Sequence, residues 1–215
     1  MNEPSEPADL GLRSRGPSPA KTAQTRRNIT AAALDAFLER GFSGTRMSDV
    51  AARAGIAKGT VYIYFADKEA LFEGVLREVL AEPLSGLGGA APRPGESVRA
   101  FLSRVAGPIL RDMERSRRAA VIRLVVAEGA RFPVLAGTYR RVVIEPAAAA
   151  IRQLARRAVE TGELRTDALV RFPQLLAAPV VLVTLWNGLF AADGPLDGET
   201  VFEAYLDMVF GPGGG

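Results

Sequence analysis

The fold is decided by residues 45–65, which read TRMSDVAARAGIAKGTVYIYF. Their apolar members recur at spacings that pack two short helices across a turn, namely Val50, Ala51, Ala54, Ile56 and Val61. Gly55 supplies the turn because glycine adopts positive φ without strain. The pattern predicts one helix over about 46–54, capped by Thr45, and a second over about 58–64.

The second of these helices carries side chains that suit the major groove of DNA. Lys58 can donate to guanine acceptors or to phosphate, and Thr60 can bond a phosphate or contact a thymine methyl group. Gly59 lets the backbone approach the sugar-phosphate closely, while Tyr62 and Tyr64 offer flat apolar area with a hydroxyl for phosphate. A plain helical hairpin with surface aromatics is the alternative, but folding alone gives little reason for two tyrosines and a lysine here. We therefore interpret residues 46–65 as a helix-turn-helix.

Helical periodicity also precedes the motif. From residue 21 an apolar residue recurs every fourth position, at Ile29, Ala33 and Phe37, and Gly41 ends this helix. Residues 1–20 are rich in proline, glycine and polar side chains, and no apolar run follows a basic start. We expect a disordered arm there and no secretion signal.

The remainder of the chain also reads as helices. Asp67 caps a helix over about 68–81, and Pro83 with the glycines and prolines of 85–95 predicts a mobile loop. Further helices are expected at about 96–114, 117–128, 133–160, 167–191 and 198–209. The predicted class is all-α, with the following organisation: a disordered arm (1–20), a three-helix helix-turn-helix DNA-binding domain (21–66), a connecting helix (67–82), a loop (83–95) and a larger helical ligand-binding and dimerisation domain (96–215).

Between Thr25 and Leu76 the sequence resembles the TetR family of transcriptional regulators. The resemblance is carried by residues 32–72, AALDAFLERGFSGTRMSDVAARAGIAKGTVYIYFADKEALF. It implies an N-terminal DNA-binding domain on a dimeric, ligand-binding helical body. It also implies the DNA-contacting residues, which are Thr45, Arg46 and Ser48 where the second helix meets DNA, Lys58, Gly59, Thr60, Tyr62 and Tyr64 on the recognition helix, and Lys68 as a phosphate contact.

Composition excludes several kinds of chemistry. The 215 residues, 48% of them hydrophobic, can bury a sizeable core. The absence of cysteine and histidine excludes disulfides, thiolate catalysis and any metal site built from these residues, and we expect no cofactor. It also excludes a switch that titrates an imidazole, and the lack of cysteine fits a cytoplasmic protein.

Charge gives weaker evidence for nucleic-acid binding. The net charge is only +3, and the first 90 residues are neutral overall. Between residues 40 and 68 there is a small basic footprint, formed by Arg40, Arg46, Arg53, Lys58 and Lys68 against Asp49 and Asp67. This neutrality predicts that a single DNA-binding domain binds weakly, so that useful affinity requires a dimer.

Residues 175–192 carry no charge and are long enough to be considered as a membrane span. Pro179, Thr184, Asn187 and Gly188 interrupt this run, and no second span accompanies it, so we expect no membrane insertion. The family resemblance implies instead that helices 167–191 and 198–209 pair with their counterparts in a homodimer.

A ligand site in the body should be concave and mostly apolar, with a few polar groups. The candidates are Phe101, Val105, Met113, Ile122, Val125, Tyr139, Val143 and Trp186, with Asn187 or Arg123 for polarity. Ordinary core packing is the alternative for each of them. Arginine clusters at 115–118, 140–141 and 152–157 favour solvated faces paired with Asp112, Glu114, Glu145 and Glu160, although binding an anionic ligand or DNA remains open.

Together these features predict a homodimeric repressor that binds a palindromic double-stranded operator and is released by a small apolar effector. An enzyme is not predicted, because the sequence shows no nucleophile–base pair, phosphate-binding glycine loop or acid dyad. A protein–protein adaptor is the remaining alternative, and it predicts no DNA binding at any salt concentration.

Overall fold

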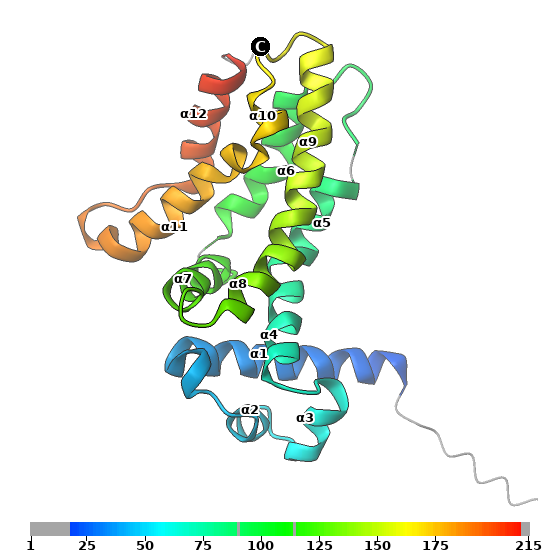
Figure 1. The fold of residues 1–215 in the computed structure, drawn as a ribbon, viewed down its shortest axis with the longest axis vertical. Helices are drawn as coiled ribbons and strands as arrows, with labels where there is room; N and C mark the ends of the chain where they lie inside the picture. The colour runs from blue at the N-terminus through cyan, green and yellow to red at the C-terminus, as the bar shows by residue number, and fades with distance from the viewer. Residues whose placement is uncertain (1–17, 90, 114, 212–215) are drawn as a thin grey trace, which may run out of the picture.

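The computed structural model describes residues 18–89, 91–113 and 115–211, and these ranges contain helices and no strand. Figure 1 shows α1 (Pro19–Gly44), α2 (Met47–Arg53) and α3 (Lys58–Tyr64) at one end of the molecule. We call these three helices the head. From it α4 (Lys68–Leu76) leads into a larger helical body. The predicted all-α class is confirmed.

The body contains α5 to α12. Its elements are α5 (Glu82–Gly89), α6 (Val98–Arg111), α7 (Arg118–Glu128), α8 (Pro133–Tyr139), α9 (Glu145–Glu160), α10 (Ala168–Arg171), α11 (Ala178–Phe190) and α12 (Gly198–Phe210). A π turn, Arg77–Ala81, joins α4 to α5, and a second, Arg140–Ile144, joins α8 to α9. Short 3-10 turns, Pro173–Ala177 and Ala191–Asp193, flank α11.

The first helix begins earlier than the sequence pattern predicts. Ser18 Oγ accepts the Lys21 N–H at 3.4 Å, and Pro19 occupies the first turn, where a missing N–H costs nothing. Residues 18–20 therefore belong to α1 and its cap, while residues 1–17 of the expected arm lie outside the described ranges. Gly41 has a φ of +70° and kinks α1 before its last residues, as expected of a residue that interrupts the helix.

The predicted cap of α2 is wrong. Thr45 is buried, and its hydroxyl donates toward the carbonyls of Ala36 and Gly41, at 3.0 and 2.8 Å. It closes the end of α1 instead. The N-cap of α2 is Arg46, whose N–H donates to Asp49 Oδ2 at 3.1 Å.

The turn between α2 and α3 forms as the sequence indicates. Gly55 has a φ of +68°, and the Ile56 N–H returns to the Ala51 carbonyl at 3.1 Å. Asp67 caps α4 as predicted, since its carboxylate accepts the Ala70 N–H at 2.7 Å.

The loop predicted over 83–95 is partly helical, because the chain continues through Pro83 into α5. Proline has no N–H to donate to the residue four positions earlier. The π turn accommodates it, since the Glu82 N–H donates to the Arg77 carbonyl. The same arrangement recurs at 140–146, where the π turn is also followed by Glu and Pro. Two stretches of similar sequence thus produce two wide turns.

The helix predicted over 167–191 is interrupted. Pro173 restricts the residue before it, and Phe172 takes a φ of −127° and a ψ of 69°. The chain therefore forms α10, a 3-10 turn and α11 instead of one helix.

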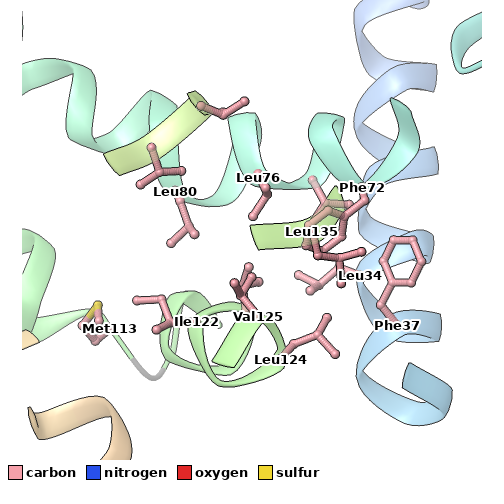
Figure 2. Close-up of a cluster of buried hydrophobic side chains, with 14 of the residues drawn as sticks. Leu34, Phe37, Phe72, Leu76, Leu80, Met113, Ile122, Leu124, Val125 and Leu135 are labelled. Carbon is pink, nitrogen blue, oxygen red and sulfur yellow. The ribbon is translucent and has the colours of Figure 1, made fainter. Parts of the chain in front are cut away.

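A continuous apolar core joins the head to the body (Figure 2). Phe37 of α1 packs edge-on against Phe72 of α4, with their ring centres 5.7 Å apart. Farther along the chain, Leu76 and Leu80 face α7, which carries Val125 and Ile122. A displacement in the body can therefore reach α1 through close-packed side chains.

Polar contacts tie α7 to α1 as well. The Glu128 carboxylate accepts the Phe42 N–H at 2.9 and 3.1 Å, and Arg117 forms an ion pair with Asp35. The two ends of α7 thus contact α1 at separate points, which makes α7 a second connection between body and head.

Candidate nucleic-acid interface and cavity

The outer face of α3 is open to solvent. Val61 is fully buried, whereas Tyr62 is 44% and Ile63 is 80% exposed. A Cβ built on Gly59 would meet no atom within 4 Å. Because residues four apart share a helix face, Gly59 and Ile63 lie on one side. Sequence reasoning missed Ile63, although its position four residues after Gly59 could have placed it there.

The nine residues predicted to contact DNA fall into three groups. The exposed ones are Arg46, Ser48, Lys58, Gly59 and Tyr62. The partly buried ones are Thr60, Tyr64 and Lys68, and the buried one is Thr45. The exposed group contains both a cation and an aromatic side chain on α3, with Lys58 Nζ 5.9 Å from the centre of the Tyr62 ring.

Lys68 is bound to the protein's own backbone. Its ammonium donates to the carbonyls of Phe42 and Thr45, at 2.7 and 3.2 Å, and lies 4.4 Å from the centre of the Phe42 ring. These contacts fix the end of α1 against the start of α4. Lys68 and Thr45 thus both bind backbone carbonyls in the structure, and the DNA contacts that the resemblance implies for them stay predictions.

Internal ion pairs reduce the basic footprint further. Arg40 pairs with Asp49 at 3.1 Å, and Arg53 donates to Glu39 at 2.7 Å. Within the described ranges no carboxylate pairs with the side chain of Arg46 or Lys58. Of the five basic residues counted between residues 40 and 68, Arg46 and Lys58 are thus the two whose side chains keep no carboxylate or backbone-carbonyl partner among the described residues. Weak binding by a single head stays a prediction.

The body contains a cavity of about 160 Å³. It is lined by Leu80, Leu84, Leu102, Ala106, Ile109, Leu110, Met113, Arg118, Ile122, Tyr139, Val143, Ile144, Ala147, Ile151, Leu176, Ala177, Val180, Val181 and Phe202. Four of the predicted pocket residues are among them: Met113, Ile122, Tyr139 and Val143. Burial raises the pKa of the Tyr139 phenol above its ordinary value because it disfavours the charged form.

The other predicted pocket residues lie elsewhere. Phe101 and Val125 are buried in the core, and Val105 packs against that core. Trp186 is 41% exposed and donates to the Gly194 carbonyl at 3.3 Å. Asn187 exchanges hydrogen bonds of 2.8 and 2.9 Å with the backbone of Leu196, beside a smaller cavity. The sequence alone did not distinguish pocket from core because helical spacing gives both the same periodicity.

Several arginines pair as the charge pattern predicts. Arg115 pairs with Asp112 at 3.3 Å, and Arg140 with Glu145 at 2.9 Å. Arg141 binds Glu73 of α4 and, with Arg77, lowers the pKa of that carboxyl from 4.5 to about 2. The predicted partner Glu114 lies outside the described ranges, and no ion pair involves Glu160 within them. Sequence reasoning missed that Arg118 lines the cavity.

Comparison with known proteins gives relatives for both parts of the chain. Residues 29–75 match the model of bacterial regulatory proteins of the tetR family, and residues 92–209 match the tetracyclin repressor-like C-terminal domain. The HTH-type transcriptional regulator RutR of Escherichia coli is 46% identical over 70 residues, which are 33% of this chain and 31% of RutR. The chain thus aligns with about a third of that relative.

Solved structures support the same fold. The SmeT–triclosan complex is 24% identical with a TM-score of 0.69, covering 86% of this chain and 89% of that one. FadR of Bacillus subtilis, in complex with stearoyl-CoA, is 19% identical with a TM-score of 0.65, covering 87% and 99%. Since the two family models together span both the head and most of the body, the chain belongs to the TetR family of bacterial regulatory proteins.

Proposed function

We propose that this protein is a homodimeric, DNA-binding repressor that a small apolar effector releases from its operator. One observation carries the proposal: a single apolar core connects the head, which exposes α3, to the apolar cavity in the body. The protein is a regulator and not an enzyme, in keeping with its family.

The DNA-binding part of the proposal rests on α3. Lys58, Gly59 and Tyr62 are exposed there, and Arg46 and Ser48 are exposed at the start of α2. We assign phosphate and base contacts to these five residues and to the exposed Ile63. The partly buried Thr60 and Tyr64 are assigned to the edge of the interface. A two-fold dimer would present two such helices, so the operator would be palindromic, with half-sites ~34–36 Å apart.

The dimer is proposed to form through the segments 167–191 and 198–209, which contain α11 and α12. These helices expose many apolar side chains, which are Val181, Leu182, Trp186, Leu189, Phe190 and Met208. The run Pro173–Asp193 is also long and apolar enough to cross a membrane, and 22% of its 18-residue apolar window is buried. However, α11 itself has 13 residues, or ~20 Å, against ~30 Å of hydrocarbon. We therefore assign this face to a partner subunit and place the protein in the cytoplasm.

The effector part of the proposal rests on the cavity. SmeT and FadR, which share the fold, are seen with triclosan and with stearoyl-CoA. A cavity of about 160 Å³ is far smaller than an acyl-CoA, so this chain suits a smaller ligand than stearoyl-CoA. The continuous apolar core between the cavity and the head provides a route by which ligand binding changes the affinity for DNA. The expected coupling free energy is ~1–3 kcal/mol.

A mobility-shift titration tests the regulator against the adaptor alternative. The probe is DNA from upstream of the protein's own gene, at salt concentrations from 50 to about 200 mM. We expect a shift whose affinity falls steeply as salt rises, and sedimentation of the free protein as a dimer. Absence of a shift at the lowest salt, with a dimer present, would favour an adaptor. A monomer that binds as tightly as expected of the dimer would contradict the proposed assembly.

A further inference from the structure

We propose that the cavity selects a ligand with an apolar body and one anionic group, which Arg118 binds. The inference rests on the proposed function, because it specifies the chemical class of the effector. The inference is based on the charge of the cavity wall and on the position of the Arg118 guanidinium.

The cavity wall carries a single kind of charge. Among the described residues that line it, only Arg118 is ionised at neutral pH, and only Tyr139 adds another polar side chain. No carboxylate lines the wall. An anion is therefore attracted to this site, while a cation meets a like charge and no carboxylate on the wall.

The Arg118 guanidinium is held loosely by the protein. Its side chain is 14% exposed, and it donates to the carbonyls of Val79 and Ile109 at 3.3 and 3.4 Å, which are long for such bonds. Its nearest carboxylate atom in a described residue, Asp112 Oδ2, is 3.8 Å away, on a side chain that is 44% exposed. A buried cation is costly unless it is well paired. A ligand carboxylate can supply a shorter, two-pronged contact that these partners do not provide.

Tyr139 provides a second donor at the same cavity. Burial raises the pKa of Tyr139 still further above neutral, so its protonated hydroxyl can donate to a carboxylate oxygen. A carboxylate, with two acceptor oxygens, matches one guanidinium and one hydroxyl better than an amine or a hydrocarbon does.

The position of Arg118 also links the ligand to the head. Its partner Val79 lies in the π turn that follows α4, and the Val79 carbonyl is available because Pro83 cannot donate to it. The preceding residue, Arg117, pairs with Asp35 of α1. A carboxylate that draws the guanidinium from Val79 removes a contact between α7 and the π turn that follows α4, so an anionic ligand should weaken DNA binding.

Three probes with one alkyl chain and different head groups test this assignment: octanoate, octanol and octylamine. Calorimetry on the full chain should give the order octanoate, then octanol, then octylamine. Arg118→Gln should weaken octanoate about tenfold or more and leave octanol within about twofold, because only the anion loses a charge-assisted contact. Arg118→Lys should give an intermediate affinity, since it keeps the charge and loses the planar fork.

Two control variants separate a specific effect of Arg118 from a general loss of arginine charge or of cavity space. Arg115→Gln removes a neighbouring arginine that is 83% exposed and outside the cavity, and it should leave octanoate binding unchanged. Ala147→Met fills the cavity and should block all three probes. Equal affinities for octanoate and octylamine in the wild type overturn the Arg118 assignment while leaving an apolar cavity. If none of the probes binds, the inference and the effector part of the proposed function are both overturned, whereas DNA binding is decided separately by the mobility shift.

Discussion

Replacing Lys58 and Tyr62 together by alanine should lower operator affinity at least ~100-fold, because each dimer loses two cations and two aromatic contacts, at ~1–3 kcal/mol per good contact. Both side chains are exposed on α3, so the fold and the dimer should persist. Since each lysine that contacts phosphate adds about one unit to the salt slope, the slope should fall by about 2 for the dimer. Fluorescence anisotropy with the DNA bound by the wild type measures both quantities.

Gly59→Leu provides the complementary change on the same face. A Cβ at this position meets nothing within 4 Å, and leucine has the higher helix propensity, so stability should be unchanged or rise by up to ~1 kcal/mol. DNA affinity should nevertheless fall, because the added side chain occupies the space in which the backbone approaches DNA. Wild-type affinity in both the double variant and Gly59→Leu would show that α3 is not the recognition helix.

The second large effect concerns stability. Phe72→Ala should destabilise the protein by ~3–5 kcal/mol, because it removes a fully buried ring from the contact between α1 and α4. For a chain of this size the midpoint of thermal unfolding should fall by roughly 10 °C. Circular dichroism followed during heating measures the change.

Ile63→Ala is the matched control for this prediction. It removes apolar atoms from a side chain that is 80% exposed, and it should change the free energy of unfolding by less than ~0.5 kcal/mol. Equal destabilisation by the two substitutions would contradict the assignment of Phe72 to the core that joins the head to the body.

The head was largely predictable because its signals are local. Gly55 needs positive φ, Asp67 caps the next turn, and the observed α3 has the predicted bounds. Thr45 and Lys68 were harder, since their partners depend on how α1 folds back over α2 and α4. A residue type suited to a phosphate contact is equally suited to binding a backbone carbonyl, and only tertiary structure separates the two.

The body was less predictable for a related reason. Pro83 reads as the end of a helix, but the π turn before it lets the chain continue. Trp186 and Asn187 have the chemistry of pocket residues, yet they bind the turn between α11 and α12. Arg118 has the chemistry of a surface residue, and it lines the cavity because α7 brings it beside α6 and the π turn that follows α4. Such placements depend on helices that are distant in sequence.

Hydroxyl-radical footprinting of a DNA sequence selected by the purified protein tests the central claim most directly. The account predicts two protected segments with related inverted sequences, centred ~34–36 Å apart, and loss of both segments when octanoate saturates the protein. A single protected segment, or no protection at low salt by a protein that is folded and dimeric, would contradict it.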